Sequence, residues 1–499
     1  MTADRGKPFL LLGVIGLLVC AGCWHQAAMK TVSEAVQEGQ QQRATAADSY
    51  GQVAGPRPTP EAHTSASAAA SAPANLQELI LHALEHNPEI QASEHTARAK
   101  ANRVAQATSL ADPLLSTKTM PTPLMLADGN QVFILGIDQD LPVPMKLDRR
   151  GQVAMDELRM ALHDLRGVQQ RVIADVKRAY FELFVIDRST DLALENKEIV
   201  KGLLDVARGQ YAAGKRDQQD VLRAQVELAS LDGDLIELRQ RRTTTLAMLN
   251  SLLDRPGGTH VDTPGGYDLR RVRARVEDLL ATAADVSPEL GRLQEQIQRD
   301  EAAVELAKLA YWPDFKVGVE WMAMEPRRPF IPLPDPDTGK RDPVDFMPSS
   351  GTDMWAITVA INLPVWFEKI EAGIREARHT LSASRQEYAA AKNQIAYRVR
   401  DAMARVRSQR ELAELFAGTI IPQAKQTYDV SLAGYTAGTS DFEFLIDNWQ
   451  KWLAFRTQYY RALGELERSV ADLEQATGVS MVDIDSIGPP DSQETQHGA

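Results

Sequence analysis

The chain has 499 residues, 44% of them hydrophobic, and a formal net charge of −13. This length allows several domains or one extended one, and the apolar content is enough to bury a sizeable core. Nucleic acid is excluded as a partner, because the neutralisation of phosphates requires a concentrated basic surface that this chain lacks.

Residues 1–22 are predicted to be a signal peptide. Arg5 and Lys7 precede the apolar run FLLLGVIGLLV, which is about half the length that a membrane-spanning helix needs. The CAGC that ends the run resembles the lipobox of bacterial lipoproteins, with Cys23 as the lipidation site and Cys20 in place of the usual leucine. Cys23 would be the only cysteine of the mature chain, so no disulfide within it is expected. A single-pass signal anchor is the alternative.

Residues 23–74 are predicted to be a lipid-anchored disordered tether, because Ala, Gln, Ser, Thr and Pro dominate the segment and leave it too few apolar residues to pack. In an extended conformation the tether would span more than about 100 Å. A second disordered segment, the tail, is predicted at 479–499.

Four features occur twice, in the same order. The segment HNPEIQASEHTARAKANRVAQATSLADP at 86–113 matches 286–313, LPV at 141–143 matches 363–365, and GQYAAGKRDQQDVL at 209–222 matches AGYTAGTSDFEFLI at 433–446. The offset rises from 200 to 222 across a proline-rich stretch at 325–351, which predicts a long loop in the second copy only. We therefore expect one repeat at 75–253, a linker at 254–275 and a second repeat at 276–478.

Each copy opens with a predicted helix of about 25 residues that begins at Asn87-Pro88 or Ser287-Pro288. Two strands follow. Segments 315–323 and 354–363 alternate apolar and polar residues, segment 132–141 does so less regularly, and its partner near 114–125 is weak. Segments of about ten residues with one apolar face that carries Trp are typical of membrane β-barrel strands. A soluble sheet with one core face is the alternative.

The strands lead into helices too long for an ordinary globular domain. No proline interrupts 145–255, and a helix over 146–208 would be on the order of 90 Å long, so it must pack on another helix. Glycines in AAG and TAG predict hairpin turns, after which a second helix returns to about residue 253 or 476. Pro422 predicts a kink or break.

These features together resemble the TolC-like outer-membrane efflux factors, and LPVPMKLDRRG at 141–151 is most similar to their heavy-metal efflux subgroup. The resemblance implies a mainly α fold with membrane β-structure, in which three chains with four strands each form a 12-stranded β-barrel continued by a periplasmic coiled-coil tunnel. Four strands cannot close a barrel alone, and lipid tolerates no open sheet edge, so oligomerisation is also required physically. Loop 325–351 would face the cell exterior.

The resemblance also implies a homotrimer in the outer membrane of a Gram-negative bacterium, in contact with membrane lipid, a periplasmic adaptor and an inner-membrane pump. The two hairpin tips would be the periplasmic end of the tunnel. It assigns adaptor docking to four residues and the periplasmic gate to three, namely Tyr211, Gly214, Tyr435 and Gly438 for docking and Asp220, Glu443 and Asp447 for the gate.

The chain departs from the family nearby, because Phe444 and Ser440 stand where polar or basic partners that close the gate are often found. A solvated helix face, or a carboxylate that stabilises a helix N-terminus, is the alternative reading of each gate residue.

No enzyme signature, cofactor site or metal site is evident in the sequence. His82, His86 and His95 cluster on one predicted early helix and are interpreted as surface residues. Methionines around the strands would suit soft metal ions, although Met more often fills space. The resemblance implies that the chain is the outer-membrane channel of a tripartite efflux pump, which exports metal ions or other small toxic compounds. A periplasmic adaptor or coiled-coil scaffold lipoprotein is the alternative.

Overall fold

In the computed structural model the described residues are 30, 31, 33, 34, 76–126, 129–267, 269, 274–326, 337, 339 and 351–480. The predicted signal peptide, Cys23, nearly all of the tether, most of loop 325–351 and most of the tail lie outside these residues. The described residues form two compact units, one from 99–158 and 295–385 and the other from 76–98, 159–294 and 386–480.

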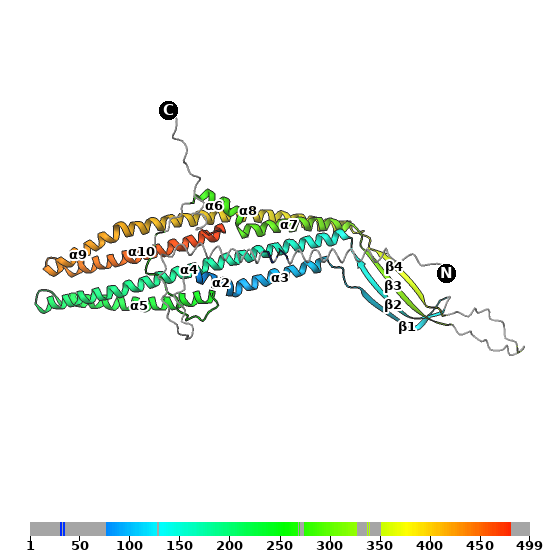
Figure 1. The fold of residues 1–499 in the computed structure, drawn as a ribbon, viewed down its shortest axis with the longest axis horizontal. Coiled ribbons are helices and arrows are strands. Elements are labelled where there is room, and N and C mark those ends of the chain that lie inside the picture. The colour runs from blue at the N-terminus through cyan, green and yellow to red at the C-terminus, as the bar shows by residue number, and fades with distance from the viewer. Residues whose placement is uncertain are drawn as a thin grey trace, which may run out of the picture. The chain divides into compact units, whose positions relative to one another are not determined.

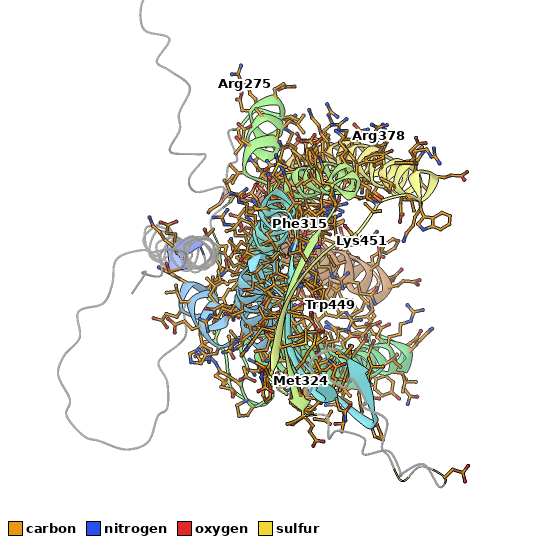
Figure 2. The ribbon with its side chains drawn as sticks, turned by 90° about the vertical axis from the view of Figure 1, so that its right-hand side faces the viewer. Arg275, Phe315, Met324, Arg378, Trp449 and Lys451 are labelled. Atoms are coloured by element: carbon orange, nitrogen blue, oxygen red, sulfur yellow. The ribbon has the colours of Figure 1, made fainter. Side chains whose placement is uncertain are left out.

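A four-stranded antiparallel sheet dominates the first unit. Its strands are β1 (Leu114–Leu126), β2 (Gly129–Leu141), β3 (Phe315–Glu325) and β4 (Met354–Ile361), in the order β1-β2-β3-β4 (Figure 1). Both repeats thus contribute two strands to one sheet, joined where β2 pairs with β3. Phe315 and Met324 lie near the two ends of β3 (Figure 2). Within the described residues, β1 and β4 have no strand on their outer sides.

The register places apolar side chains of β2, β3 and β4 on one face, to which β1 adds Leu115. Trp321 pairs with Leu135 of β2 and with Trp355 of β4, and the residues two positions along each strand continue the same face. The members of this apolar face include Leu115, Leu135, Ile137, Phe315, Val317, Val319, Trp321, Trp355, Ile357, Val359 and Ile361. The alternation predicted for the second copy is therefore confirmed, whereas in the first copy Thr117 and Gln139 interrupt the same face.

The opposite face of the sheet carries the charged side chains of the strand centres, beside the apolar pair Ile134 and Met322. Asp138 on β2 lies across from Gly318 on β3, and Glu320 on β3 lies across from Gly136 on β2. The glycines leave room for the acids, since a Cβ added at Gly318 would lie 2.5 Å from Asp138 Oδ1. The sheet thus has one apolar face and one charged face.

A buried lysine holds the corner where the strands meet the helices. Lys146, in the LPVPMK segment, is 7% exposed. Its Nζ donates hydrogen bonds of 2.8 Å to the Trp312 carbonyl and to Asp314 Oδ1, just before β3 begins. The Asn362 N–H donates to the Asp314 carbonyl at 3.2 Å. These contacts join the end of β2 to the start of β3 and the end of β4.

The second unit is helical. Four of its helices continue across the boundary in the sequence and also contribute residues to the first unit. The first copy contains α2 (Leu76–His86), α3 (Pro88–Thr108), α4 (Pro144–Ala212) and α5 (Gln218–Leu252). The second copy contains α6 (Val276–Val286), α7 (Pro288–Lys308), η1 (Leu309–Tyr311), α8 (Phe367–Leu415), η2 (Phe416–Ile420), α9 (Ile421–Ala437) and α10 (Phe442–Thr477). Figure 1 shows α4 beside α5, and α9 beside α10, as two antiparallel hairpins.

The kink or break expected at Pro422 takes the form of a π-helical turn, and the residues on both sides keep right-handed helical φ and ψ. Residues Phe416–Ile420 form one π-helical turn, and α9 resumes with Pro422 in its first turn. Proline has no N–H to donate to the preceding turn, so a helix can continue through it only with locally altered hydrogen bonding. The α4 helix, which lacks an internal proline, is continuous over its 69 residues.

Equivalent positions of the two copies form two of the cores of this unit. Leu79 and Ala83 of α2 pack in a core with Leu249 of α5, and Leu279 and Ala283 of α6 pack in a core with Leu473 of α10. Helices α2 and α6 precede the helices that the sequence predicted, and each ends where the Asn-Pro or Ser-Pro pair begins the next helix. The duplication seen in the sequence is thus a duplication of packing.

Candidate functional site at the hairpin tips

The two hairpin tips have the same backbone turn. Gly214 and Gly438 adopt the left-handed conformation, with φ of +68° and +82°, which residues with a Cβ rarely adopt. In both tips the glycine N–H donates to the carbonyl of the tyrosine three residues earlier, at 2.9 Å from Tyr211 and 3.1 Å from Tyr435. The Y-x-x-G pattern therefore encodes a helix-ending turn, and this is the physical reason for the glycine.

The two tyrosines differ in their surroundings. Tyr211 is 49% exposed, whereas Tyr435 is 0% exposed and packs against Phe442. The Tyr435 hydroxyl donates a 3.1 Å hydrogen bond to Asp220 Oδ2 of the other hairpin. Burial, together with the negative charge of Asp220, raises the pKa of the Tyr435 phenol well above its usual value, so the hydroxyl stays protonated and can donate.

Arg216 links the first tip to the second. Its Nη1 lies 3.1 Å from Asp441 Oδ1, and its Nη2 donates to the Ser440 carbonyl. The guanidinium also lies 5.3 Å from the centre of the Tyr435 ring, within the range of a cation–π interaction. Ser440 stands at a position where a polar or basic gate partner is often found. Here Arg216 of the opposite tip places a positive charge beside this position.

The other two predicted gate residues lie on the first turns of α10 and have basic partners. Glu443 forms a 3.2 Å ion pair with Arg223 of α5, and Asp447 forms a 2.7 Å ion pair with Lys451 one turn later. Glu443, Asp447 and Arg223 line a groove of about 460 Å³ between α5 and α10, together with Gln219, Leu222, Val226, Glu227, Ile446 and Gln450. Since the pairs are exposed, water screens them and leaves the acids free to exchange partners.

Above the tips, a buried polar contact fixes α10 against α4. Trp449 is 1% exposed and its indole Nε1–H donates a 2.8 Å hydrogen bond to Asn196 Oδ1. The Asn196 side chain is itself buried and donates to the Leu192 carbonyl at 2.7 Å. Because the alternative for each group is an unsatisfied donor or acceptor in an apolar core, this pair favours one register of α10 on α4.

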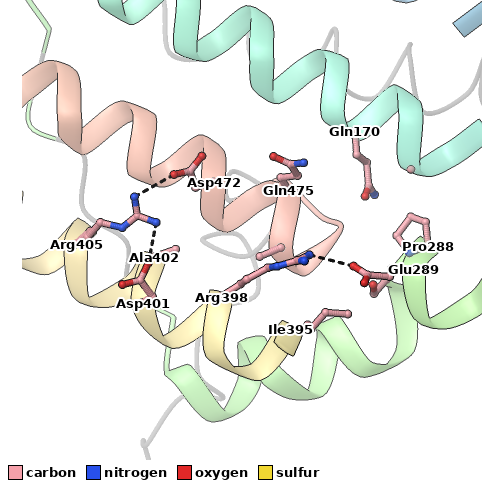
Figure 3. Close-up of a pocket in the computed structure, with 13 residues that line it drawn as sticks. Gln170, Pro288, Glu289, Ile395, Arg398, Asp401, Ala402, Arg405, Asp472 and Gln475 are labelled. Carbon is pink, nitrogen blue, oxygen red and sulfur yellow. Dashed lines mark hydrogen bonds and ion pairs between the residues drawn. The ribbon is translucent and has the colours of Figure 1, made fainter. Parts of the chain in front are cut away.

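A cavity of about 450 Å³ lies farther from the tips, among residues of α4, α7, α8 and α10 (Figure 3). Arg398 pairs with Glu289 across it at 3.0 Å. Gln170 donates a 2.8 Å hydrogen bond to the carbonyl of Gly478, just after α10 ends. The charged side chains that line this cavity therefore form ion pairs with one another.

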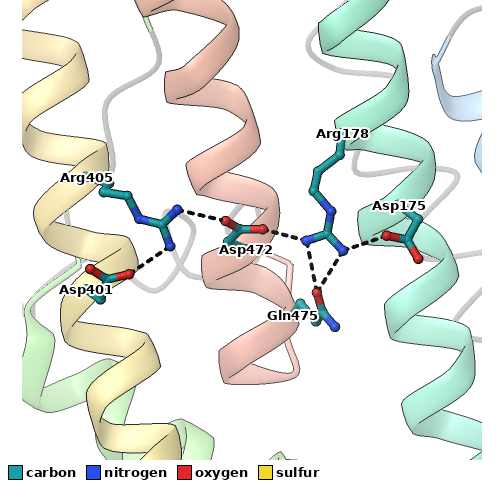
Figure 4. A network of polar contacts seen from close by, with 6 residues as sticks. All are labelled: Asp175, Arg178, Asp401, Arg405, Asp472 and Gln475. Carbon is teal, nitrogen blue, oxygen red and sulfur yellow. Dashed lines mark hydrogen bonds and ion pairs between the residues drawn. The ribbon is translucent and has the colours of Figure 1, made fainter. Parts of the chain in front are cut away.

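Beside this cavity, Asp472 of α10 joins two arginines from different helices (Figure 4). It accepts a 2.5 Å hydrogen bond from Arg178 of α4 and a 3.3 Å hydrogen bond from Arg405 of α8. Each arginine also pairs with an aspartate on its own helix, Asp175 at 2.7 Å and Asp401 at 2.9 Å. The network therefore ties three helices together through one carboxylate, which sequence spacing gives no means to predict.

Comparison with known proteins agrees with this architecture. The model of the outer membrane efflux protein family matches residues 79–255 and 279–479, which is more than half of the chain and includes both copies. The chain belongs to the outer membrane efflux protein family. The predicted family is therefore confirmed, and so is the prediction that the chain is not an enzyme, since this is a family of channels.

One curated relative of this efflux protein is the cobalt-zinc-cadmium resistance protein CzcC of Cupriavidus metallidurans, which is 22% identical over 319 residues that cover 64% of this chain and 70% of the relative. Solved channels share the fold. The Campylobacter jejuni outer membrane channel CmeC matches with a TM-score of 0.66 at 14% identity, over 85% of this chain and 94% of that chain. CusC matches with a TM-score of 0.67 at 14% identity, over 81% of this chain and 92% of that chain.

The structure also corrects one expectation for this efflux protein. The three early histidines do not share a helix, because Asn87 separates α2, which carries His82 and His86, from α3, which carries His95. No group of three or more potential metal ligands occurs in the described part of the chain. Over the same residues, no helix is both long and apolar enough to cross a membrane.

Proposed function

We propose that this chain is the outer-membrane channel of a tripartite efflux pump and exports metal cations or other small toxic compounds. The observation that carries the proposal is the sheet, whose apolar face runs over β2, β3 and β4 and includes Ile357 at 78% exposure. Exposed aliphatic side chains in such number are unfavourable in water and favourable in lipid. Membership in an outer-membrane family supports the same reading.

A homotrimer follows from the two open edges of the sheet. Main-chain N–H and C=O groups at the outer sides of β1 and β4 need partners, because lipid offers no hydrogen bonds to replace those of water. Pairing of β4 in one chain with β1 in the next satisfies both edges. Three chains would supply the 12 strands of a closed barrel with the charged face inside.

The hairpin tips would then form the periplasmic end of the channel. The turns at Tyr211–Gly214 and Tyr435–Gly438 are the proposed docking surface for a periplasmic adaptor that connects to an inner-membrane pump. Of the two tyrosines, Tyr211 is exposed and available to a partner, whereas Tyr435 binds Asp220 within the chain. We therefore assign docking mainly to the first tip and closure of the gate mainly to the Tyr435–Asp220 contact.

Metal cations are the preferred cargo. The relative CzcC is named as a cobalt-zinc-cadmium resistance protein. In a trimer, Glu443 and Asp447 would each appear three times around the entrance, and a ring of carboxylates attracts cations and excludes anions. Since Lys451 and Arg223 offset these charges in the single chain, the net attraction depends on which partners the acids keep in the assembly.

Cys23 is proposed as the lipid attachment site, although it lies outside the described residues. Cys23→Ser should abolish incorporation of labelled fatty acid without preventing trimer formation, because the barrel would still hold the protein in the membrane. Incorporation of label into the variant would contradict the lipobox reading.

The channel and its gate are tested by the conductance of purified trimers in planar bilayers. The Asp447→Asn, Glu443→Gln double variant should lower cation selectivity or weaken block by multivalent cations, whereas Lys451→Gln should change both in the opposite direction. If conductance, selectivity and block of all these variants equal those of the parent, these residues do not line the entrance. A parent protein that forms no conducting pores would contradict the channel itself.

A further inference from the structure

Two histidines of α2 lie one helical turn apart, on the side of the helix opposite its buried residues. His82 is partly buried and His86 is exposed, whereas four apolar residues bury the other side, namely Leu79, Ile80, Ala83 and Leu84. The imidazole rings of His82 and His86 are stacked, with 4.2 Å between their centres and 16° between their planes. The two rings are therefore close enough to bind one ion together.

The hydrogen bond of His86 leaves one of its ring nitrogens available. His86 Nδ1 lies 3.1 Å from the carbonyl oxygen of His82. A carbonyl oxygen can only accept, so Nδ1 carries the proton, and in the neutral ring Nε2 keeps a free lone pair. Histidines that bind metal ions are commonly held in this way, with one ring N–H donated to a carbonyl and the other nitrogen on the metal.

The surroundings of His82 favour the neutral ring that a metal ion requires. Burial lowers the pKa of His82 below its usual value, and the positive charge of Arg255 acts in the same direction. A hydrogen bond of the ring with the Leu253 backbone, and the charge of Glu85, oppose this shift in part. That hydrogen bond engages one nitrogen of the His82 ring and leaves the other. Since only neutral imidazole binds a metal ion, the ring is suited to be a ligand near pH 7.

We propose that His82 and His86 together bind one divalent cation of the late first transition series, with Zn²⁺ as the reference ion. This inference goes beyond the proposed function, because it concerns neither the sheet nor the hairpin tips. Side chains at positions i and i+4 lie on one face of a helix, and two histidines at this spacing chelate zinc in the HExxH motif. Imidazole suits zinc, copper and nickel, whereas Mg²⁺ and Ca²⁺ prefer oxygen ligands.

The site binds a metal ion without catalysing a reaction. The segment HALEH has Ala83 at the position where HExxH has its general base. No third His, Cys, Asp or Glu within the described ranges completes a group of metal ligands. Water therefore occupies the other positions of a tetrahedral ion. Because the pair lies at the surface, the ion can enter and leave while the helix stays folded.

Only the first of the two copies carries this pair. Thr282 and Val286 of α6 stand 200 residues after His82 and His86, at the equivalent positions. The Thr282 hydroxyl donates a 2.9 Å hydrogen bond to the Asp278 carbonyl of its own helix. The duplication therefore supplies one histidine pair for each chain, which sets the expected stoichiometry.

Calorimetric titration of the full-length protein in detergent with zinc chloride tests the proposal. The variants His82→Asn and His86→Asn each remove one ligand and keep a polar side chain. His95→Asn is the matched control, because His95 is also exposed but lies on α3. The parent should bind one zinc ion per chain, and each ligand variant should bind it at least about tenfold more weakly. His95→Asn should bind zinc like the parent.

X-ray absorption at the zinc edge provides a second readout, which should show two imidazoles on the ion in the parent. Zinc that binds to His82→Asn and His86→Asn as tightly as to the parent would overturn the proposal, as would an absorption spectrum with oxygen ligands only. Thermal melts without zinc check that the variants are folded, since substitutions at such surface positions change stability by only about 0.5 kcal/mol. Conductance without zinc should be unchanged in both variants, so failure of the zinc site leaves the proposed channel intact.

Discussion

The contact between Tyr435 and Asp220 can be tested by removing a single oxygen atom. Tyr435→Phe keeps the aromatic ring that packs on Phe442 and deletes only the hydroxyl that donates to Asp220. Tyr428 provides a matched control, because it is also a buried tyrosine of α9 and its ring stacks on Trp452 of the same hairpin, with 5.4 Å between the ring centres. Any effect specific to position 435 therefore reports the bridge.

The magnitude follows from the burial of the two partners. A hydrogen bond to a charged group contributes about 1.5–3 kcal/mol when it is well shielded from water. Tyr435 is fully buried but Asp220 is partly exposed, so we expect a value at or just below the lower end of this range, about 1–2 kcal/mol for each chain, or a factor of about 5–30 in the ratio of closed to open tips. If three tips open together, the costs add to about 3–6 kcal/mol.

The assay is the open probability of single trimers in planar bilayers. Tyr435→Phe should open far more often than the parent, whereas Tyr428→Phe should behave like the parent. Asp220→Asn keeps an acceptor without the charge and should give an intermediate effect. If Tyr435→Phe opens no more often than Tyr428→Phe, the hydrogen bond does not hold the tips closed and the reasoning is refuted.

Two further predictions concern the packing of α10 on α4. Asn196→Leu leaves the buried Trp449 N–H without its acceptor and should lower the free energy of unfolding by about 1–3 kcal/mol. In the double variant with Trp449→Phe, the loss of stability measured by thermal melting should be smaller than the sum of the two single losses. Additive losses would argue against the hydrogen bond. Gly464→Ala places a Cβ 2.2 Å from Val185 Cγ2 and should cost about 1–3 kcal/mol. A Cβ added at Gly202 has no atom within 4 Å, so Gly202→Ala should instead raise the free energy of unfolding by about 0.4–1 kcal/mol. Equal melting temperatures of the Gly464→Ala and Gly202→Ala variants would show that α10 and α4 do not approach closely at Gly464.

The sequence determined the repeated parts of this protein. Pairs such as Asn87-Pro88 and Ser287-Pro288 mark the starts of α3 and α7, and Gly214 and Gly438 mark the tips, because each depends on backbone geometry within a few neighbouring residues. Alternation of apolar residues predicted the strands for the same reason, since side chains of a strand point to opposite faces in turn.

Only the tertiary structure decided what equivalent residues do. Tyr211 and Tyr435 occupy the same position of the same motif, yet one is exposed and the other is buried against the opposite hairpin. Arg216 contacts the second tip, and Asp472 contacts two arginines of other helices. The residues of the Arg216–Asp441 and Arg178–Asp472 pairs are 225 and 294 positions apart in the sequence, far beyond the length of a motif. Local sequence sets the conformation of a segment, but the surroundings of its side chains depend on which distant segment packs against it, and that is decided by packing across helices.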